Sequence, residues 1–409
     1  MIIVIGGGAA GMLASIRAAE KDAPVTLIER NIDVGKKIRI TGKGRCNVTN
    51  ACPTEEIFEN IPTNHRFLYS AIYSFTNYDV MSFFEECGVP LKEERGQRVF
   101  PVSDKATDIV SALRRKMQEL NVNIVNGRVT DIMVADGKVK GVKTEKSIYF
   151  CDNVIVATGG KSYPLTGSTG DGYTMAEKLG HSITPIKPAL VPVETKESTK
   201  ELMGLSLRNI SVTVFDSKGK KKFSDFGEML FTHFGLTGPV ILSSSSHMGK
   251  NPEDCRIEID LKPALDEQTL DKRILRDFEK YQNRNFENSL SDLLPGKMIE
   301  YIVGKSGIDR YKKVNSITKD ERKTLLGLLK HLTFTIKGYR PVAEAIVTSG
   351  GVNVKEINAS TMESKLVSGL FFAGEVIDVD AYTGGFNLQI AFSTGYLAGD
   401  CAAEKELSV

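Results

Sequence analysis

The chain begins with MIIVIGGGAAGMLA (residues 1–14), and this stretch decides the fold. The run Met1–Ile5 is wholly apolar, which is typical of a strand buried on both faces of a parallel sheet. The glycines that follow match G-x-G-x-x-G, and a small-residue helix is expected over about 9–20. A second buried strand, over 25–28, ends at Glu29. Together these segments predict a βαβ unit at the N-terminus.

This βαβ unit predicts dinucleotide binding. Gly6 permits the tight turn, Gly8 lets the backbone approach a pyrophosphate, and Gly11 permits close packing of helix and strand. The N-terminus of the helix favours negative charge. Glu29 follows Gly11 by 18 residues, where a carboxylate can bind the hydroxyl pair of a ribose. An ordinary glycine-rich turn would explain the glycines but not the strand, the helix and Glu29 in register.

The N-terminal pattern does not separate NAD from FAD, but three later features favour FAD. Glycine-containing strand ends recur at ATGG (157–160) and AGE (373–375), and TGG (383–385) precedes a small-residue helix expected over 387–402. Strand ends that return to one sheet suit FAD, whose long body runs from the N-terminal turn to a flavin held by C-terminal residues. Each junction taken singly has a plainer interpretation, a strand that ends in a turn.

Composition bounds the class of protein. The 409 residues are 25% charged and 41% apolar, which is ordinary for a globular chain of two or three domains. Lys and Arg number 53 against 51 Asp and Glu, and this balance argues against a dedicated nucleic-acid binder. Six cysteines without C-x-x-C spacing exclude a zinc ribbon and a thioredoxin-like pair. Because no uncharged run reaches about 20 apolar residues, we expect a cytoplasmic protein with no membrane partner.

The middle of the chain differs from both ends in composition and in expected secondary structure. Three prolines over 185–192 mark an expected domain crossing. Residues 205–231 and 255–261 alternate as antiparallel strands do, and 266–330 is charged and helical. Strands and glycines resume beyond Pro341. This order predicts an insertion into a doubly wound α/β domain.

Several long segments resemble the bacterial BaiN/YhiN-like flavoproteins. This group comprises NAD(P)/FAD-dependent oxidoreductases and includes aminoacetone-oxidase-like members. The resemblance runs over essentially the full length, with one departure at Ala381, where family members often carry Gly. Its motifs lie at 35–50, 157–173, 231–239, 361–365 and 369–399.

The resemblance implies an α/β fold, with a glutathione-reductase-like (Rossmann-type) FAD-binding domain interrupted by two inserted parts. The FAD-binding domain would span 1–188 plus 341–409. A β-barrel would span 189–265 plus 331–340, and a helical subdomain would span 266–330. The inserted parts would cover the flavin and shape the substrate pocket.

The resemblance also implies the cofactor-binding residues. Lys36 and Arg45 would supply cationic donors to phosphate, and the N-terminus of the 387–402 helix would stabilise negative charge on a reduced flavin. We further expect Arg45 to lower the pKa of Cys46. For the basic loop at 35–47 the alternative is a solvated turn, and for Val129 it is core packing. The full set is Gly6, Gly8, Ala9, Ala10, Gly11, Glu29, Arg30, Lys36, Thr41, Gly42, Gly44, Arg45, Cys46, Asn47, Val129, Ala157, Thr158, Gly159, Gly374, Glu375, Asp378, Gly385, Asn387, Leu388 and Gln389.

Two residues are candidates for catalysis. His233 lies in FTHFGLTGP (231–239), and hydride transfer to or from carbon often needs such a proton donor. Tyr163 is the second candidate. The plainer interpretations are a buried structural histidine and a packing tyrosine. No metal site is expected.

We therefore expect an FAD-dependent oxidoreductase that transfers hydride between flavin and a small organic substrate. FAD would be bound tightly and without a covalent link, with NAD(P)H or O2 as the second redox partner. No second G-x-G-x-x-G occurs, so NAD(P)H would use a transient site. Two alternatives stay open. One is a flavin-dependent tRNA-modifying enzyme, whose insert would carry a basic face, and the other is an FAD-binding regulatory protein without turnover.

Overall fold

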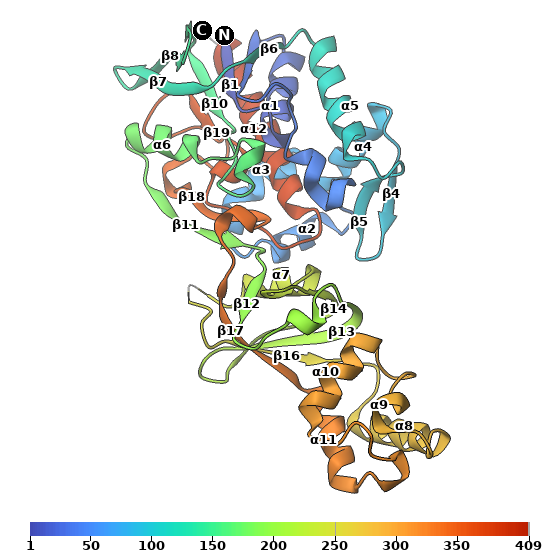
Figure 1. The fold of residues 1–409 in the computed structure, drawn as a ribbon. Coiled ribbons are helices and arrows are strands. Elements are labelled where there is room, and N and C mark those ends of the chain that lie inside the picture. The colour runs from blue at the N-terminus through green and yellow to red at the C-terminus, as the bar shows by residue number, and fades with distance from the viewer. Residues whose placement is uncertain (250, 408–409) are drawn as a thin grey trace. The chain divides into compact units, whose positions relative to one another are not determined.

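In the computed structural model, which describes residues 1–249 and 251–407, the apolar N-terminal run forms the central strand of a parallel sheet (Figure 1). The sheet has five strands in the order β19-β10-β1-β2-β6. Strand β1 is buried along its whole length, as the pattern predicts. The strands are β1 (Ile2–Ile5), β2 (Val25–Glu29), β6 (Asn123–Asn126), β10 (Asn153–Val156) and β19 (Leu370–Phe372).

The chain divides into two units, each with its own hydrophobic core. The first unit comprises Met1–Ala189 with Val342–Val409, and the inserted unit comprises Leu190–Pro341. The chain leaves the first unit along β11 (Ile183–Ala189) and returns along β18 (Val347–Val352), and these two strands pair antiparallel.

Two helices of the first unit approach each other closely because they present small residues. Helix α1 (Ala9–Glu20) packs against α12 (Phe386–Leu407), which is longer than the 387–402 helix that the sequence predicts. A Cβ on Gly395 or Gly399 would lie 2.4 and 2.3 Å, respectively, from backbone oxygens of α1. A Cβ on Gly11 would lie 1.9 Å from the carbonyl oxygen of Gly6. Only glycine fits at these three positions.

Smaller elements complete the first unit. Two three-stranded sheets have the orders β3-β5-β4 and β7-β8-β9, and short helices connect the strands. The strands are β3 (Thr49–Asn50), β4 (Leu91–Glu94), β5 (Arg98–Pro101), β7 (Val129–Ala135), β8 (Lys138–Thr144) and β9 (Ile148–Phe150). The helices are α2 (Thr54–Ile57), α3 (Tyr69–Ser74), α4 (Asn77–Glu86), α5 (Ala106–Glu119) and α6 (Asp171–Lys178).

The inserted unit is a closed barrel with a helical part between its last two strands. The barrel order is β12-β15-β14-β13-β16-β17. Its strands are β12 (Val193–Thr195), β13 (Ser206–Phe215), β14 (Lys221–Phe231), β15 (Gly235–Thr237), β16 (Arg256–Asp260) and β17 (Leu332–Tyr339). Its helices are α7 (Pro239–Ser245), α8 (Glu267–Lys280), α9 (Phe286–Ser289), α10 (Gly296–Ser306) and α11 (Lys319–Lys330). The predicted fold class, a Rossmann-type α/β domain interrupted by a barrel and helices, is confirmed.

Across residues 1–249 and 251–407, no helix has both the length and the apolar character needed to cross a lipid bilayer.

The close packing of α1 and α12 yields a stability prediction. Gly399→Ala should lower the midpoint of thermal unfolding, because overpacking of this kind typically costs about 1–3 kcal/mol. Gly304→Ala on α10 is the matched control: no atom lies within 4 Å of its added Cβ, and Ala favours helix over Gly. Differential scanning calorimetry compares the two variants with the parent protein. Equal stability of the two variants would contradict the packing described.

Candidate functional site

The strand ends that the sequence singles out lie side by side at one edge of the parallel sheet. Ile5 aligns with Val156, and Val156 aligns with Phe372. The loops that follow β1, β10 and β19 therefore start next to one another. Ligands of open α/β sheets bind beside such carboxyl ends.

The first of these loops has the geometry of a phosphate cradle. Gly6 has φ +102°, and a Cβ there would lie 2.5 Å from the carbonyl oxygen of Ala157. At Gly8, in contrast, no atom lies within 4 Å of the Cβ position. The backbone at Gly8 thus borders a space that a side chain would fill, directly before α1. The first backbone N–H groups of a helix, here those of Ala9, Ala10 and Gly11, have no partner within the helix and suit an anion.

Glu29 contacts this loop from the end of β2. Its carboxylate accepts a hydrogen bond of 2.6 Å from the backbone N–H of Gly7. It also accepts two hydrogen bonds of 2.7 Å from the backbone and side chain of Asn31. An ionised carboxylate offers about four acceptor positions, so one remains for a ribose hydroxyl. Glu29 therefore both shapes the glycine turn and retains capacity for a ligand.

Arg30 and Val129, two further predicted residues, are engaged within the first unit. The Arg30 guanidinium donates hydrogen bonds to Thr169 Oγ1 at 2.6 Å and Asp171 Oδ2 at 3.2 Å. Asp171 also accepts a hydrogen bond from Arg128. Val129 is buried at the start of β7. The structure thus links Arg30 to the loop before α6.

In the basic loop, the two predicted phosphate donors differ in their surroundings. Arg45 donates to Asp104 at 2.8 Å, pairs with Glu94 and lies 4.2 Å from the ring centroid of Phe100. Lys36 is exposed and forms no hydrogen bond or ion pair with the residues that the structure describes. Arg45 is therefore held by acidic side chains near β4 and β5, whereas Lys36 is free to meet a ligand.

The predicted effect of Arg45 on Cys46 is wrong. The Cys46 side chain is buried, and burial raises the pKa of its thiol to about 12, against a smaller opposing effect of Thr41. Arg45 adds no compensating charge, because its guanidinium is directed at Glu94 and Asp104. Although Arg45 directly precedes Cys46, its guanidinium does not contribute to the pKa shift of the Cys46 thiol.

Other residues of the predicted set carry unsatisfied polar atoms. The buried Asn47 Oδ1 and Thr158 Oγ1 have no hydrogen-bond partner in the structure. They belong to the basic loop and to the loop after β10. The remaining members, Thr41, Gly42, Gly44, Ala157 and Gly159, lie in the same two loops. Open space at Gly8 and two orphaned acceptors are features of a site that fits a dinucleotide such as FAD.

The C-terminal members of the predicted set, at the start of α12, form hydrogen bonds within the first unit. Gln389 is buried. Its side-chain oxygen accepts a hydrogen bond of 2.6 Å from Thr49 Oγ1, and its side-chain nitrogen donates one of 3.0 Å to the carbonyl of Phe75. The Asn387 amide donates to the carbonyl of Ala381 at 2.7 Å and closes the loop before α12. Leu388 is half-buried beside them. These contacts fix the start of α12, so any role at the flavin belongs to the backbone there.

Gly374 and Gly385 occupy tight positions in this region. A Cβ on Gly374 would lie 2.8 Å from the Cβ of Ala10, and one on Gly385 would lie 2.4 Å from the carbonyl oxygen of Thr49. Asp378 is buried and accepts a hydrogen bond of 3.2 Å from Asn64.

An ion pair that sequence reasoning missed joins the loops. Lys37 donates to Glu375 Oε2 at 2.6 Å and to Ser162 Oγ at 2.7 Å. Glu375 Oε1 accepts from Ser162 at 3.0 Å and from the backbone N–H of Thr348 at 2.8 Å. Burial alone would raise the pKa of Glu375, but the Lys37 ammonium and the hydrogen bonds hold it below its ordinary value. The only signal of this ion pair in the sequence is the doublet Lys36-Lys37. The doublet does not indicate which of the two lysines faces Glu375.

Asp380 is a second missed residue. Its side chain is buried, and one carboxyl oxygen has no hydrogen-bond partner. Burial raises the pKa of Asp380, and the like charges of Asp378 and Glu375 act in the same direction, against hydrogen bonds with Thr63 and Ser349. The sequence offered one signal, an acidic residue two positions after Asp378.

The two catalytic candidates lie in different units. Tyr163 is half-buried in the first unit, has φ +51° and directly follows Ser162 of the ion-pair network. Burial raises the pKa of its phenol. His233 is exposed in the turn between β14 and β15, with its ring 5.1 Å from that of Phe234. The interpretation of His233 as a buried core residue is therefore wrong.

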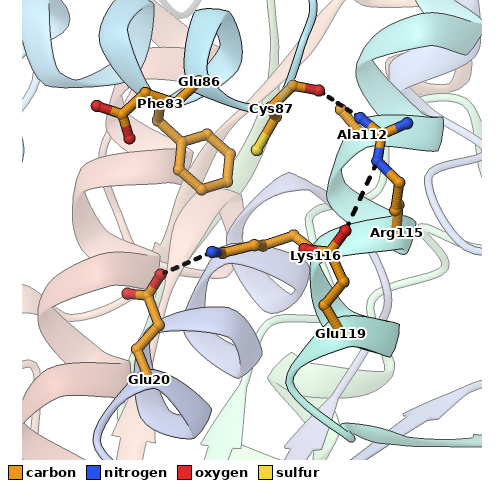
Figure 2. A pocket seen from close by; sticks show the side chains of 8 residues that line it. All are labelled: Glu20, Phe83, Glu86, Cys87, Ala112, Arg115, Lys116 and Glu119. Atoms are coloured by element: carbon orange, nitrogen blue, oxygen red, sulfur yellow. Dashed lines mark hydrogen bonds and ion pairs between the residues drawn. The ribbon is translucent and has the colours of Figure 1, made fainter.

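A pocket in the first unit lies away from these loops (Figure 2). It includes Glu20, the last residue of α1, roughly 18 Å along the helix from the glycine turn at 1.5 Å per residue. Lys116 is directed at Glu20, and Arg115 at the carbonyl of Cys87 and at Glu119. None of its lining residues belongs to the predicted set, so it is not the predicted site. Its lining is Glu20, Phe83, Glu86, Cys87, Ala112, Arg115, Lys116 and Glu119.

Comparisons with known proteins agree with this geometry. The family model described as HI0933-like protein Rossmann domain matches residues 1–401. The chain is 34% identical to a ribosomal RNA dihydrouridine synthase of Haemophilus influenzae, over 96% of each chain. It is 29% identical to a 3-dehydro-bile acid delta(4,6)-reductase of Clostridium scindens, over 98% of each chain. The solved Escherichia coli quinol fumarate reductase FrdA shares the fold, with a TM-score of 0.53 and 18% identity over all of this chain and 70% of that one.

The Lys37–Glu375 pair yields a prediction. Lys37→Met should lower the free energy of unfolding by about 1–3 kcal/mol, because it leaves the partly buried Glu375 carboxylate without its cation. Lys36→Met, the same change one residue earlier, should stay within about 0.5 kcal/mol of the parent. Urea unfolding of both variants measures the difference. If Lys36→Met proves the more damaging change, the pair does not hold the loops together.

Proposed function

The chain belongs to the HI0933-like Rossmann-domain family and is an FAD-dependent oxidoreductase, and from this premise we propose that it reduces a carbon–carbon double bond conjugated to a carbonyl group. The proposed substrate is a uridine of ribosomal RNA, which takes up two hydrogens to become dihydrouridine. NAD(P)H is the proposed electron donor, and FAD is proposed to be bound tightly and without a covalent link.

One observation carries the proposal: the end-to-end similarity, at 34% identity, to a ribosomal RNA dihydrouridine synthase. Dihydrouridine forms when the 5,6 double bond of uracil, conjugated to the C4 carbonyl, is reduced. The bile acid relative is likewise named as a reductase of a 3-oxo compound with conjugated double bonds. The reaction class common to both names is hydride addition to an activated double bond.

The distribution of charge supports an RNA substrate over a small molecule. The inserted unit contains 26 Lys and Arg against 21 Asp and Glu, whereas the rest of the chain contains 27 against 30. The net charge of +2, which argued against a nucleic-acid partner, is the sum of a basic unit and an acidic unit. A positive surplus attracts a polyanion through release of its counterions.

The residues of the first unit have distinct tasks in this proposal. Bound FAD would supply the hydride. The backbone at Gly8 and the first N–H groups of α1 would hold its pyrophosphate, and Glu29 would accept a hydrogen bond from its ribose. The Lys37–Glu375 pair fixes the loops on either side. The N-terminal N–H groups of α12 would stabilise negative charge at the reacting end.

The reduction also requires a proton on the second carbon, and both sequence candidates stay proposals. Tyr163 is supported by its half-buried place beside Ser162, where burial raises the pKa of its phenol. His233 is supported by its exposed imidazole in a turn of the inserted unit.

A second candidate function keeps the same chemistry with a small substrate. The relative that reduces a bile acid matches 98% of both chains, so a steroid-like enone is the competing substrate class. The two classes differ in one measurable respect, the presence of RNA in the product.

The function is tested by supplying purified protein with NADH or NADPH and unmodified ribosomal RNA. We expect dihydrouridine in the digested RNA, detected by mass spectrometry as uridine with two added hydrogens. Transfer RNA and a panel of steroid enones serve as competing substrates. Oxidation of NAD(P)H by an enone, with ribosomal RNA left unmodified, would select the small-molecule function instead.

Glu29 provides a test of cofactor binding alone. Glu29→Gln should raise the dissociation constant for FAD about ten- to a hundredfold, because it removes charge-assisted hydrogen bonds to the glycine turn and the ribose. Glu55→Gln, at an exposed acid of α2, is the control and should bind FAD as the parent does. Titration of flavin-stripped protein, followed by fluorescence, measures both. Equal affinities would remove Glu29 from the FAD site.

A further inference from the structure

The tip of the β13–β14 hairpin concentrates positive charge in the inserted unit. The sequence there is DSKGKKK (216–222), and the four lysines, Lys218, Lys220, Lys221 and Lys222, are all exposed. With Asp216 as the only acid, the tip supplies more than half of the basic surplus of the unit. A run of lysines can be a simple solvated turn. The geometry of the tip and its surroundings decide whether it is instead a binding surface.

The turn is ordered by Asp216. Its carboxylate accepts hydrogen bonds from the backbone N–H groups of Lys218 at 3.0 Å and Lys220 at 2.9 Å. These bonds hold the pKa of Asp216 below its ordinary value. Gly219 has φ +79°, which lets the chain reverse within the turn. The lysine stems therefore project from a fixed backbone.

Most of the lysine charges are uncompensated. Lys222 lies 3.3 Å from Asp216. Lys218, Lys220 and Lys221 form no ion pair within the described part of the chain. Elsewhere in the inserted unit, the exposed Lys280 and the half-buried Lys312 are paired with carboxylates at 2.7 Å. The hairpin tip thus holds three neighbouring lysines without a carboxylate partner within one short turn.

The adjoining barrel surface carries groups that suit nucleic-acid bases. Arg256 on β16 lies 5.0 Å from the ring centroid of Phe215, the last residue of β13. Phe226 on β14 is 42% exposed. Aromatic rings and guanidinium planes stack on unpaired bases, while lysines bind the phosphates of the strand.

We propose that the lysine hairpin, residues 216–222 with Arg256 and Phe226, is a docking surface for the phosphate backbone of RNA. The inference rests on the proposed function, in which the reacting base belongs to ribosomal RNA. The hairpin binds RNA through charge and selects no sequence, because phosphate contacts position a nucleic acid without reading its bases. It thereby deepens that function by naming the surface that holds the substrate.

The test compares two variants that remove the same charge. The first changes Lys218, Lys220, Lys221 and Lys222 to Gln. The matched control changes four exposed, unpaired lysines of β8 and the turn after it in the first unit to Gln: Lys138, Lys140, Lys143 and Lys146. Affinity for purified 16S and 23S ribosomal RNA is measured by fluorescence anisotropy at several salt concentrations.

We expect the hairpin variant to bind ribosomal RNA at least tenfold more weakly at about 0.1 M salt, with a salt slope smaller by roughly 0.7–0.9 for each phosphate that is no longer neutralised. The RNA affinity of the control variant should stay within about twofold of that of the parent, because its lysines do not belong to the hairpin. Both variants should retain bound FAD and its reduction by NAD(P)H, since none of the changed lysines belongs to the set expected to bind FAD.

Two results would overturn the docking surface: unchanged RNA affinity in the hairpin variant, or an equal decrease in both variants. The proposed function is judged separately, by whether the parent protein forms dihydrouridine. If it forms none, the affinities of the two variants for ribosomal RNA still decide whether the hairpin binds RNA.

Discussion

The approach of α1 to the sheet and to α12 is the constraint on which the first unit depends. Gly11 lies against the backbone of Gly6, and Gly395 and Gly399 lie against the backbone of α1. A methyl group at any of these positions would push α1 outward. The N-terminus of α1 would then no longer face the loops after β10 and β19. Cofactor geometry in this chain is therefore set first by the absence of side chains and only afterwards by the polar residues around it.

A second level of organisation is electrostatic. The inserted unit is basic and the first unit acidic, although the chain as a whole is almost neutral. Within the first unit, two positive groups of the basic loop are matched by acids: Lys37 by Glu375, and Arg45 by Glu94 and Asp104. On the hairpin of the inserted unit, three neighbouring lysines have no carboxylate partner. The charges that hold these loops together are thus paired, whereas those of the hairpin are open to an external polyanion.

The elements that sequence reasoning located are those encoded by short-range patterns. The strand–glycine–helix order fixes β1 and α1, and buried apolar runs mark the strand ends that share one edge of the sheet. The pairing of Lys37 with Glu375 could not be predicted, because 338 residues separate the partners and Lys36 has the same charge. The pKa of Cys46 was likewise predicted wrongly from its place next to Arg45 in the sequence. The Arg45 guanidinium turns toward β4 and β5, a direction that tertiary packing sets.

Both crossings between the two units run through one antiparallel pair, β11 and β18. Insertion or replacement of the 152 residues between Ala189 and Val342 thus leaves the order of the parallel sheet and its hydrogen bonds unchanged. The inserted unit can therefore change in sequence and in size while the strand ends that carry the candidate cofactor loops keep their places in the first unit.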